Sequence, residues 1–208
     1  MKKIFDALLK PSRLILIVAA FAYAGIYSVV TLGGFGGGFL PVVARLIIFV
    51  LTLAAVVAIP VLLLLKKEEA AKIVFLLVAG YWLISESRNY LGFAEVTDSQ
   101  NGLVVATGVF GFLAGLALVG VLVLLVLHFI LKKEVFKFIA LLAFLGAYLF
   151  IFVFVILEFV LFIKYEAGWT NYVELFLYLI APVGVLFGYL YFLGAPNYEF
   201  KSASKPEQ

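Results

Sequence analysis

The sequence of 208 residues contains no cysteine, a single histidine and few charged residues. The lack of cysteine excludes disulfides, thiolate metal sites, iron–sulfur clusters and cysteine nucleophiles. A lone His128, close to Lys132 and Lys133, excludes a metal centre built from several histidines, and it is expected to be an ordinary interfacial residue. We therefore expect neither a metal ion nor any other cofactor.

Motifs typical of catalysis are also absent. The sequence has no HExxH zinc motif and no GxSxG nucleophile motif. Asp6 and Asp98 are the only aspartates, and both lie outside the long apolar runs, which excludes an intramembrane aspartyl pair. We expect no enzymatic activity.

Apolar residues dominate what is present. The chain is 66% hydrophobic and 13% charged, whereas soluble domains contain roughly 45–50% apolar and about 25% charged residues. A single water-soluble core of this size could not bury such an excess. The composition predicts an all-α, polytopic integral membrane protein whose main partner is the lipid bilayer and which binds no nucleic acid.

A helix that spans a bilayer needs about 20 predominantly apolar residues. The chain contains six such segments, which we expect to form a single domain over residues 1–208: 14–32, 40–65, 73–91, 103–131, 138–163 and 175–193. The first segment runs well past the small residues at 22–24, so we expect a retained helix rather than a cleaved signal peptide. The glycine run at 33–38 is expected to form a hairpin, and 194–208 a polar cytoplasmic tail.

The third segment raises a question, because its apolar part ends at Ile84. About a dozen residues cover roughly 18 Å, against a hydrocarbon core of about 30 Å. Backbone groups left unpaired in hydrocarbon cost several kcal/mol each. We therefore expect the helix to continue through the polar stretch ISESRNY to about Leu91, with a re-entrant segment as the alternative.

The distribution of cations predicts the orientation. All but three of the fifteen Lys and Arg residues fall before the first segment, in alternate loops or in the tail; the exceptions are Arg45, Arg88 and Lys164. Lys and Arg accumulate on the cytoplasmic side of membrane proteins. Both termini are therefore expected in the cytoplasm, in a multi-pass protein of the cell membrane.

Four ionisable residues fall within or at the edge of the apolar segments: Arg45, Glu86, Arg88 and Glu158. Charge at the centre of a bilayer costs about 2.5–3.5 kcal/mol per residue on insertion scales, and less near its surface. Pairing across helices reduces this cost. The sequence favours either two pairs, Arg45 with Glu86 and Glu158 with Arg88, or one network of four.

Polar residues at a similar depth could extend this cluster. They are Ser85 and Asn89, beside Arg88 and Glu86, and Tyr27, Ser28 and Thr31 of the first segment. In one interpretation the cluster consists of structural ion pairs. In the other it lines an outward-facing pocket for a small polar or zwitterionic ligand, or an ion path, since an intramembrane charge is by default a functional-site hypothesis. Transport or solute binding is the leading function, and Glu158→Gln is expected to abolish binding.

Small residues recur at the spacing that lets membrane helices approach closely. They are Gly108, Gly111 and Gly115, Gly184 and Gly188, and Ala20 and Ala24. They either pack the bundle internally or form a docking face for a second copy or a partner membrane subunit. The second reading gives the alternative function, a non-catalytic accessory subunit of a larger membrane complex.

The predicted topology, the chain length and the pair Ala20/Ala24 resemble the substrate-binding component of energy-coupling-factor vitamin transporters. That family uses alanine-spaced residues in its first helix to contact its partner. The resemblance implies a partner contact at Ala20 and Ala24. It rests on these features alone and does not assign the chain to the family.

Overall fold

The computed structural model describes residues 2–33, 39–93 and 101–194, with side chains at 11–31, at Val43 and from Leu46 onward within these ranges. It is all-helical, and six helices are long and apolar enough to span a membrane. The helices are α1 Lys2–Gly33, α2 Phe39–Leu64, α3 Glu68–Gly92, α4 Gly102–Leu131, α5 Glu134–Lys164 and α6 Trp169–Leu193. The glycine hairpin, the polar tail from residue 195 and the Arg45 side chain lie outside the described part.

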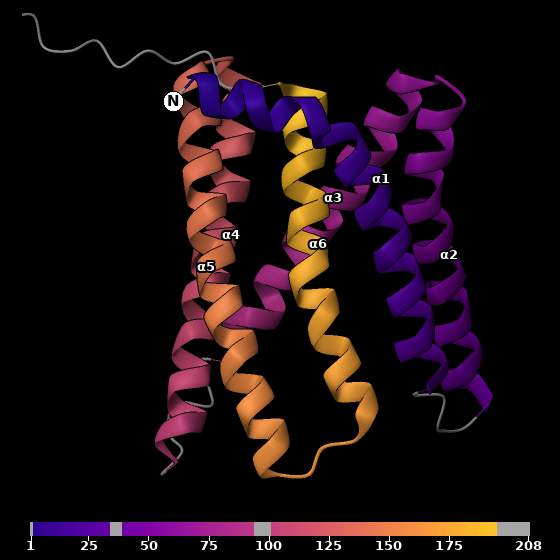
Figure 1. Ribbon diagram of the computed structural model, residues 1–208, viewed down its shortest axis with the longest axis vertical. Helices are drawn as coiled ribbons and strands as arrows, with labels where there is room; N and C mark the ends of the chain where they lie inside the picture. The colour runs from indigo at the N-terminus through magenta and orange to yellow at the C-terminus, as the bar shows by residue number, and fades with distance from the viewer. Residues whose placement is uncertain (1, 34–38, 94–100, 195–208) are drawn as a thin grey trace, which may run out of the picture.

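Four helices begin at least four residues earlier than the apolar pattern predicted. α3, α5 and α6 start at Glu68, Glu134 and Trp169, four to six residues before the expected positions. Acidic residues such as Glu68 are favourable in the first turn of a helix because they interact with its dipole. α1 begins at Lys2 and contains Pro11, a residue that commonly kinks helices. Figure 1 shows its first turns lying across one end of the bundle before the helix turns to run along it.

The polar stretch ISESRNY is helical. α3 runs without interruption from Glu68 to Gly92, and Phe93 caps its end. The expected continuation to about Leu91 is thus confirmed, and the re-entrant alternative is wrong for this segment.

The bundle has two parts, which are connected by α3 and by the packing of α5 on α6. α1 packs on α2 and α6, while α4 packs on α5; α3 contacts α2, α4 and α6 (Figure 1). The start of α1 and the end of α6 lie at the same end as the lysine-bearing turns at 65–67 and 132–133. We call this end the basic end. Large apolar side chains are exposed on every helix, among them Val18, Leu51, Leu77, Val126, Leu149 and Phe176.

Polar side chains tie helices together at the basic end. The contacts are Arg13 Nη2 to the Leu63 carbonyl at 2.7 Å, Lys137 Nζ to the Leu193 carbonyl, and the Tyr191 hydroxyl to Glu68 at 3.0 Å. Two of them satisfy carbonyl groups in the last turns of α2 and α6, which have no partner within the helix. Lys137, counted in the sequence as a loop cation, is buried within α5.

The glycines of α4 bring it against the end of α3. A Cβ atom added at Gly115 would lie 2.9 Å from the Leu91 backbone nitrogen, and one at Gly111 would lie 3.1 Å from the Phe93 ring. Gly108, one turn earlier, is also buried. This face of α4 therefore packs inside the chain.

The other small residues also contact the chain's own helices. A Cβ at Gly188 would overlap the Phe75 ring of α3 at 2.1 Å, and one at Gly184 would lie 3.4 Å from the Ala19 Cβ atom of α1. Ala20 and Ala24 are buried in a cluster with Val56 of α2. The internal-packing interpretation accounts for each of these positions.

We predict that Gly115→Ala destabilises the protein by about 1–3 kcal/mol, because the added methyl group overlaps the α3 backbone. The measurement is thermal or denaturant-induced unfolding of the purified protein in detergent. Gly120→Ala in the same helix is the matched control, since its Cβ would meet nothing within 4 Å. Equal stability of the two variants would contradict the close approach of α3 and α4.

Candidate functional site: a cavity between α1, α2, α3 and α6

A cavity of about 260 Å³ lies between α1, α2, α3 and α6. Its wall consists of Leu16, Ala19, Ala20, Tyr23, Tyr27, Ile48, Thr52, Val56, Ile59, Phe75, Val78, Ala79, Tyr81, Trp82, Ser85, Glu86, Ile180, Ala181, Gly184 and Val185. Small-molecule pockets commonly measure roughly 300–1,000 Å³. The cavity therefore has room for a compact solute rather than a large amphiphile.

Each of the four helices contributes one of its faces to the cavity wall. Residues spaced by three or four lie on the same helical face. The lining residues of α3 follow this spacing from Phe75 through Ala79, Trp82 and Glu86, and those of α1 follow it from Leu16 to Tyr27. The sequence thus places the polar residue Glu86 on the same face as apolar residues that begin three turns earlier.

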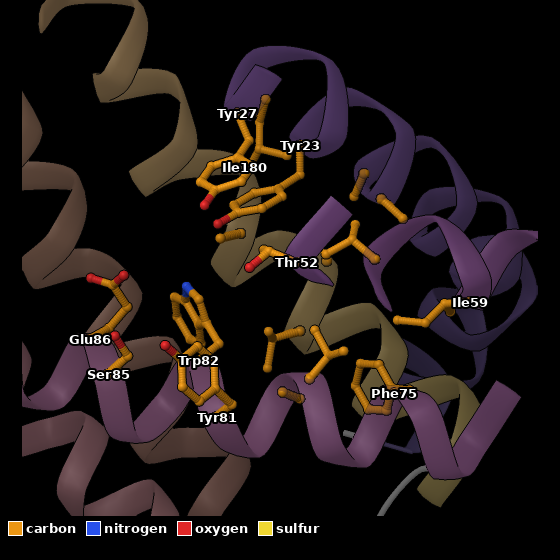
Figure 2. A pocket seen from close by; sticks show the side chains of 18 of the residues that line it. Tyr23, Tyr27, Thr52, Ile59, Phe75, Tyr81, Trp82, Ser85, Glu86 and Ile180 are labelled. Carbon is orange, nitrogen blue, oxygen red and sulfur yellow. The ribbon is translucent and has the colours of Figure 1, made fainter. Parts of the chain in front are cut away.

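Polar groups gather in one half of the cavity. Figure 2 shows Tyr23 and Tyr27 of α1 facing Trp82, Ser85 and Glu86 of α3 across the open space, with the apolar Ile59 and Phe75 further along. The two tyrosine rings stack with their centroids 5.8 Å apart. The cavity is therefore amphipathic, with its aromatic and polar part in the half remote from the basic end.

The carboxylate of Glu86 is the most unusual group in this wall. Its Oε2 atom is buried and has no hydrogen-bond partner within the described structure. Asn89, one turn further along α3, is close enough to interact with the other part of the carboxylate. A buried acceptor without a partner costs about 1–3 kcal/mol, and more when it is charged. Glu86 is thus held at a position that weakens the fold.

Two more carboxylates lie behind Glu86, away from the cavity wall. Glu158 of α5 and Glu174 of α6 lie near enough to Tyr178 for their charges to act on its hydroxyl, as does Glu86. The Tyr178 ring contacts Tyr90 with centroids 6.1 Å apart. No group of three or more His, Cys, Asp or Glu side chains that could hold a metal ion is found among the described residues.

The predicted ion pairs are not all present. Arg88 is exposed, and within the described part of the chain no ion pair joins it to Glu158. That pairing is wrong because α3 directs Arg88 outward while Glu158, half-buried on α5, lies by Glu174. The Arg45–Glu86 pair stays a prediction, since the Arg45 side chain lies outside the described residues.

Only part of the predicted ligand-binding set lines the cavity. Tyr27, Ser85 and Glu86 do, whereas Asn89, Arg88 and Glu158 are not among the lining residues. The Ser28 hydroxyl instead donates to the Ala24 carbonyl of its own helix at 2.7 Å.

Several residues in and around the candidate site were not predicted from the sequence. Tyr23 lies one turn before Tyr27, and Trp82 one turn before Glu86, so helical spacing could have identified both. Glu174 was placed in a loop because hydropathy starts the sixth segment one residue later, whereas α6 begins at Trp169. Tryptophan and tyrosine are common on the lipid-facing side of apolar helices, so these residues were not interpreted as part of a cavity wall.

We predict that the cavity admits water. The chain has no cysteine, so Ser85→Cys supplies a single thiol in the wall, which should react with a membrane-impermeant thiosulfonate reagent. Ala147→Cys, at a position with 0% exposure in the helix core, is the matched control and should stay unmodified. Mass spectrometry of the labelled protein measures both. An unreactive Ser85→Cys that labels after detergent unfolding would contradict a wet cavity.

No protein-family model, curated protein or solved structure matches this chain. The function is therefore inferred from the cavity and its lining residues.

Proposed function

We propose that this protein is a multi-pass protein of the cell membrane that binds a small solute in the cavity between α1, α2, α3 and α6 during transport. The observation that carries the proposal is the position of Glu86, a carboxylate without an ion-pair partner among the described side chains, in the wall of a cavity within a strongly apolar bundle. The tyrosines of α1 and Ser85 of α3 add hydroxyl groups to the same wall.

The energetic argument favours a binding role for Glu86. Folding gains nothing from a buried carboxylate oxygen without a partner, because desolvation of the charge is left uncompensated. Proteins commonly break such local rules at functional sites and compensate elsewhere. A solute in the cavity that interacts with Glu86 would offset part of this cost.

Membrane insertion is supported by the six apolar helices and their exposed apolar surfaces. The basic end carries Lys66, Lys67, Lys132 and Lys133 in its two turns. Under the positive-inside rule this end faces the cytoplasm. The polar half of the cavity then lies towards the outer face of the membrane.

The accessory-subunit alternative is less well supported. It relied on the glycine and alanine faces as docking surfaces, and these residues contact other helices of the same chain. We therefore retain solute binding as the proposed function.

The orientation can be tested with single cysteines. In intact cells, Glu166→Cys, in the α5–α6 turn, should react with an impermeant maleimide, while Lys67→Cys, in the α2–α3 turn, should react only after permeabilisation. Both positions are exposed, so access to the reagent differs only by side of the membrane. The reverse pattern would contradict the proposed orientation.

Filling the cavity should abolish solute binding. Thr52 of α2 lines the wall, so Thr52→Phe places a ring in the open space. The wild-type protein should be stabilised against heat by at least one class in a panel of amino acids, quaternary ammonium ions, carboxylates and sugars. Thr52→Phe should lose that stabilisation, because the ring occupies the space that the solute needs.

The matched control is Ala54→Phe on an exposed position of the same helix. It should keep both the fold and the response to the solute. A wild-type protein that responds to no member of the panel, or a response that Thr52→Phe leaves unchanged, would count against binding in this cavity.

A further inference from the structure

We propose that the solute is a compact organic cation of the quaternary ammonium class, held by Glu86 and by the aromatic rings of α1 and α3. This inference rests on the proposed function and names the ligand chemistry of the same cavity. It follows from the charge, the aromatic rings and the volume of the wall.

The first argument is charge. Among the described cavity-lining residues, Glu86 is the only Asp, Glu, Lys, Arg or His, and the remaining polar groups are hydroxyls and an indole nitrogen. Glu174 of α6, a further acidic residue, lies near enough to Glu86 to act on its charge. In the described structure no Lys or Arg forms an ion pair with Glu86. The negative charge of these carboxylates would repel an anion, whereas it would attract a cation.

The second argument is the aromatic content of the wall. Tyr23, Tyr27, Tyr81 and Trp82 line the cavity, and the first two face Trp82 across it. The face of an aromatic ring attracts a cation within about 6 Å of its centroid, and this interaction is the known basis for recognising quaternary ammonium groups. An inorganic cation would instead require several oxygen ligands.

The third argument is the apolar surface in the other half of the cavity. Leu16, Ile59, Phe75 and Val78 give the other half of the cavity an apolar surface. A strongly hydrated ion gains nothing there, while an alkyl or benzyl substituent can be buried. A volume of about 260 Å³ limits the ligand to a small substituted ammonium ion.

The chain offers a built-in reporter of binding. It has two tryptophans, of which Trp82 lines the cavity and Trp169 lies at the exposed start of α6. Trp169→Phe therefore leaves Trp82 as the sole tryptophan. In lipid nanodiscs, titration of this variant with benzyltrimethylammonium should change its fluorescence in a saturable way.

Two side-chain changes test the predicted contacts. Glu86→Gln should weaken binding by at least about thirtyfold, the change expected when one partner of a desolvated charge pair is removed. Tyr27→Leu should weaken it by about threefold to thirtyfold through loss of one aromatic ring. Glu158→Gln, which the sequence led us to expect would abolish binding, neutralises a carboxylate outside the cavity wall and should instead leave binding unchanged.

Controls separate binding from misfolding and from the proposed function. Each variant is first compared with the parent for its elution volume and thermal unfolding, and Glu86→Asp, which retains the charge, should bind more tightly than Glu86→Gln. Benzenesulfonate and glycine betaine serve as the anionic and zwitterionic probes. Neither should displace benzyltrimethylammonium.

Three results would overturn the inference. Saturable binding of benzenesulfonate instead of the cation would show that the ligand is an anion. The proposal that the cavity binds a solute would still hold. Binding of glycine betaine that Arg45→Gln abolishes would show that Arg45 completes a zwitterion site, again leaving solute binding intact. If none of the probes binds and Ser85→Cys does not react with the thiosulfonate reagent, the proposed solute binding in the cavity is contradicted as well.

Discussion

The close approach of α4 to the end of α3 is the contact on which the arrangement of the site depends. Gly111 and Gly115 let α4 lie against Phe93 and the Leu91 backbone. Small residues are the usual means by which apolar helices approach in a membrane, where lipid offers no hydrophobic incentive to associate. Because α3 also contacts α2 and α6, this anchorage holds it between the two parts of the bundle. Glu86 reaches the cavity wall as a consequence of that position.

The cavity combines features that disfavour folding with features that favour recognition. Its wall interrupts the packing between α1, α2, α3 and α6, and the buried Glu86 Oε2 atom has no partner in the described part of the chain. The packed clusters of the bundle compensate for this cost. One is centred on Tyr90, Phe154 and Ile151; the other contains Leu63 together with Leu16 and Phe75, which belong to the apolar half of the cavity wall.

Sequence reasoning succeeded where one physical constraint acted alone. The need to satisfy the backbone predicted a continuous α3 through ISESRNY, and hydropathy located the six helices. It failed where the answer depends on how helices rotate against each other. Arg88 and Glu158 have matching depth and opposite charge, yet Arg88 faces outward and no ion pair forms between them in the described structure. Glu174 was overlooked because a polar first turn is invisible to a hydropathy pattern, although such a turn is helical. The cavity itself could not be predicted, because it belongs to four helices jointly.

The side-chain hydrogen bonds at the basic end determine where the helices are held together. At this end, hydrogen bonds from Arg13 and Lys137 join α1 to the last turns of α2 and α5 to the last residue of α6. A hydrogen bond from Tyr191 to Glu68 joins α6 to α3. At the opposite end of the described chain, the Asn101 side-chain amide donates a hydrogen bond to the Tyr165 hydroxyl at 2.9 Å and joins the start of α4 to the end of α5. Among the described residues, the hydrogen bonds that join the four helices of the cavity to one another lie at the basic end. Beside Tyr27 these helices meet through packing, as in the stacking of Tyr27 of α1 on Phe49 of α2.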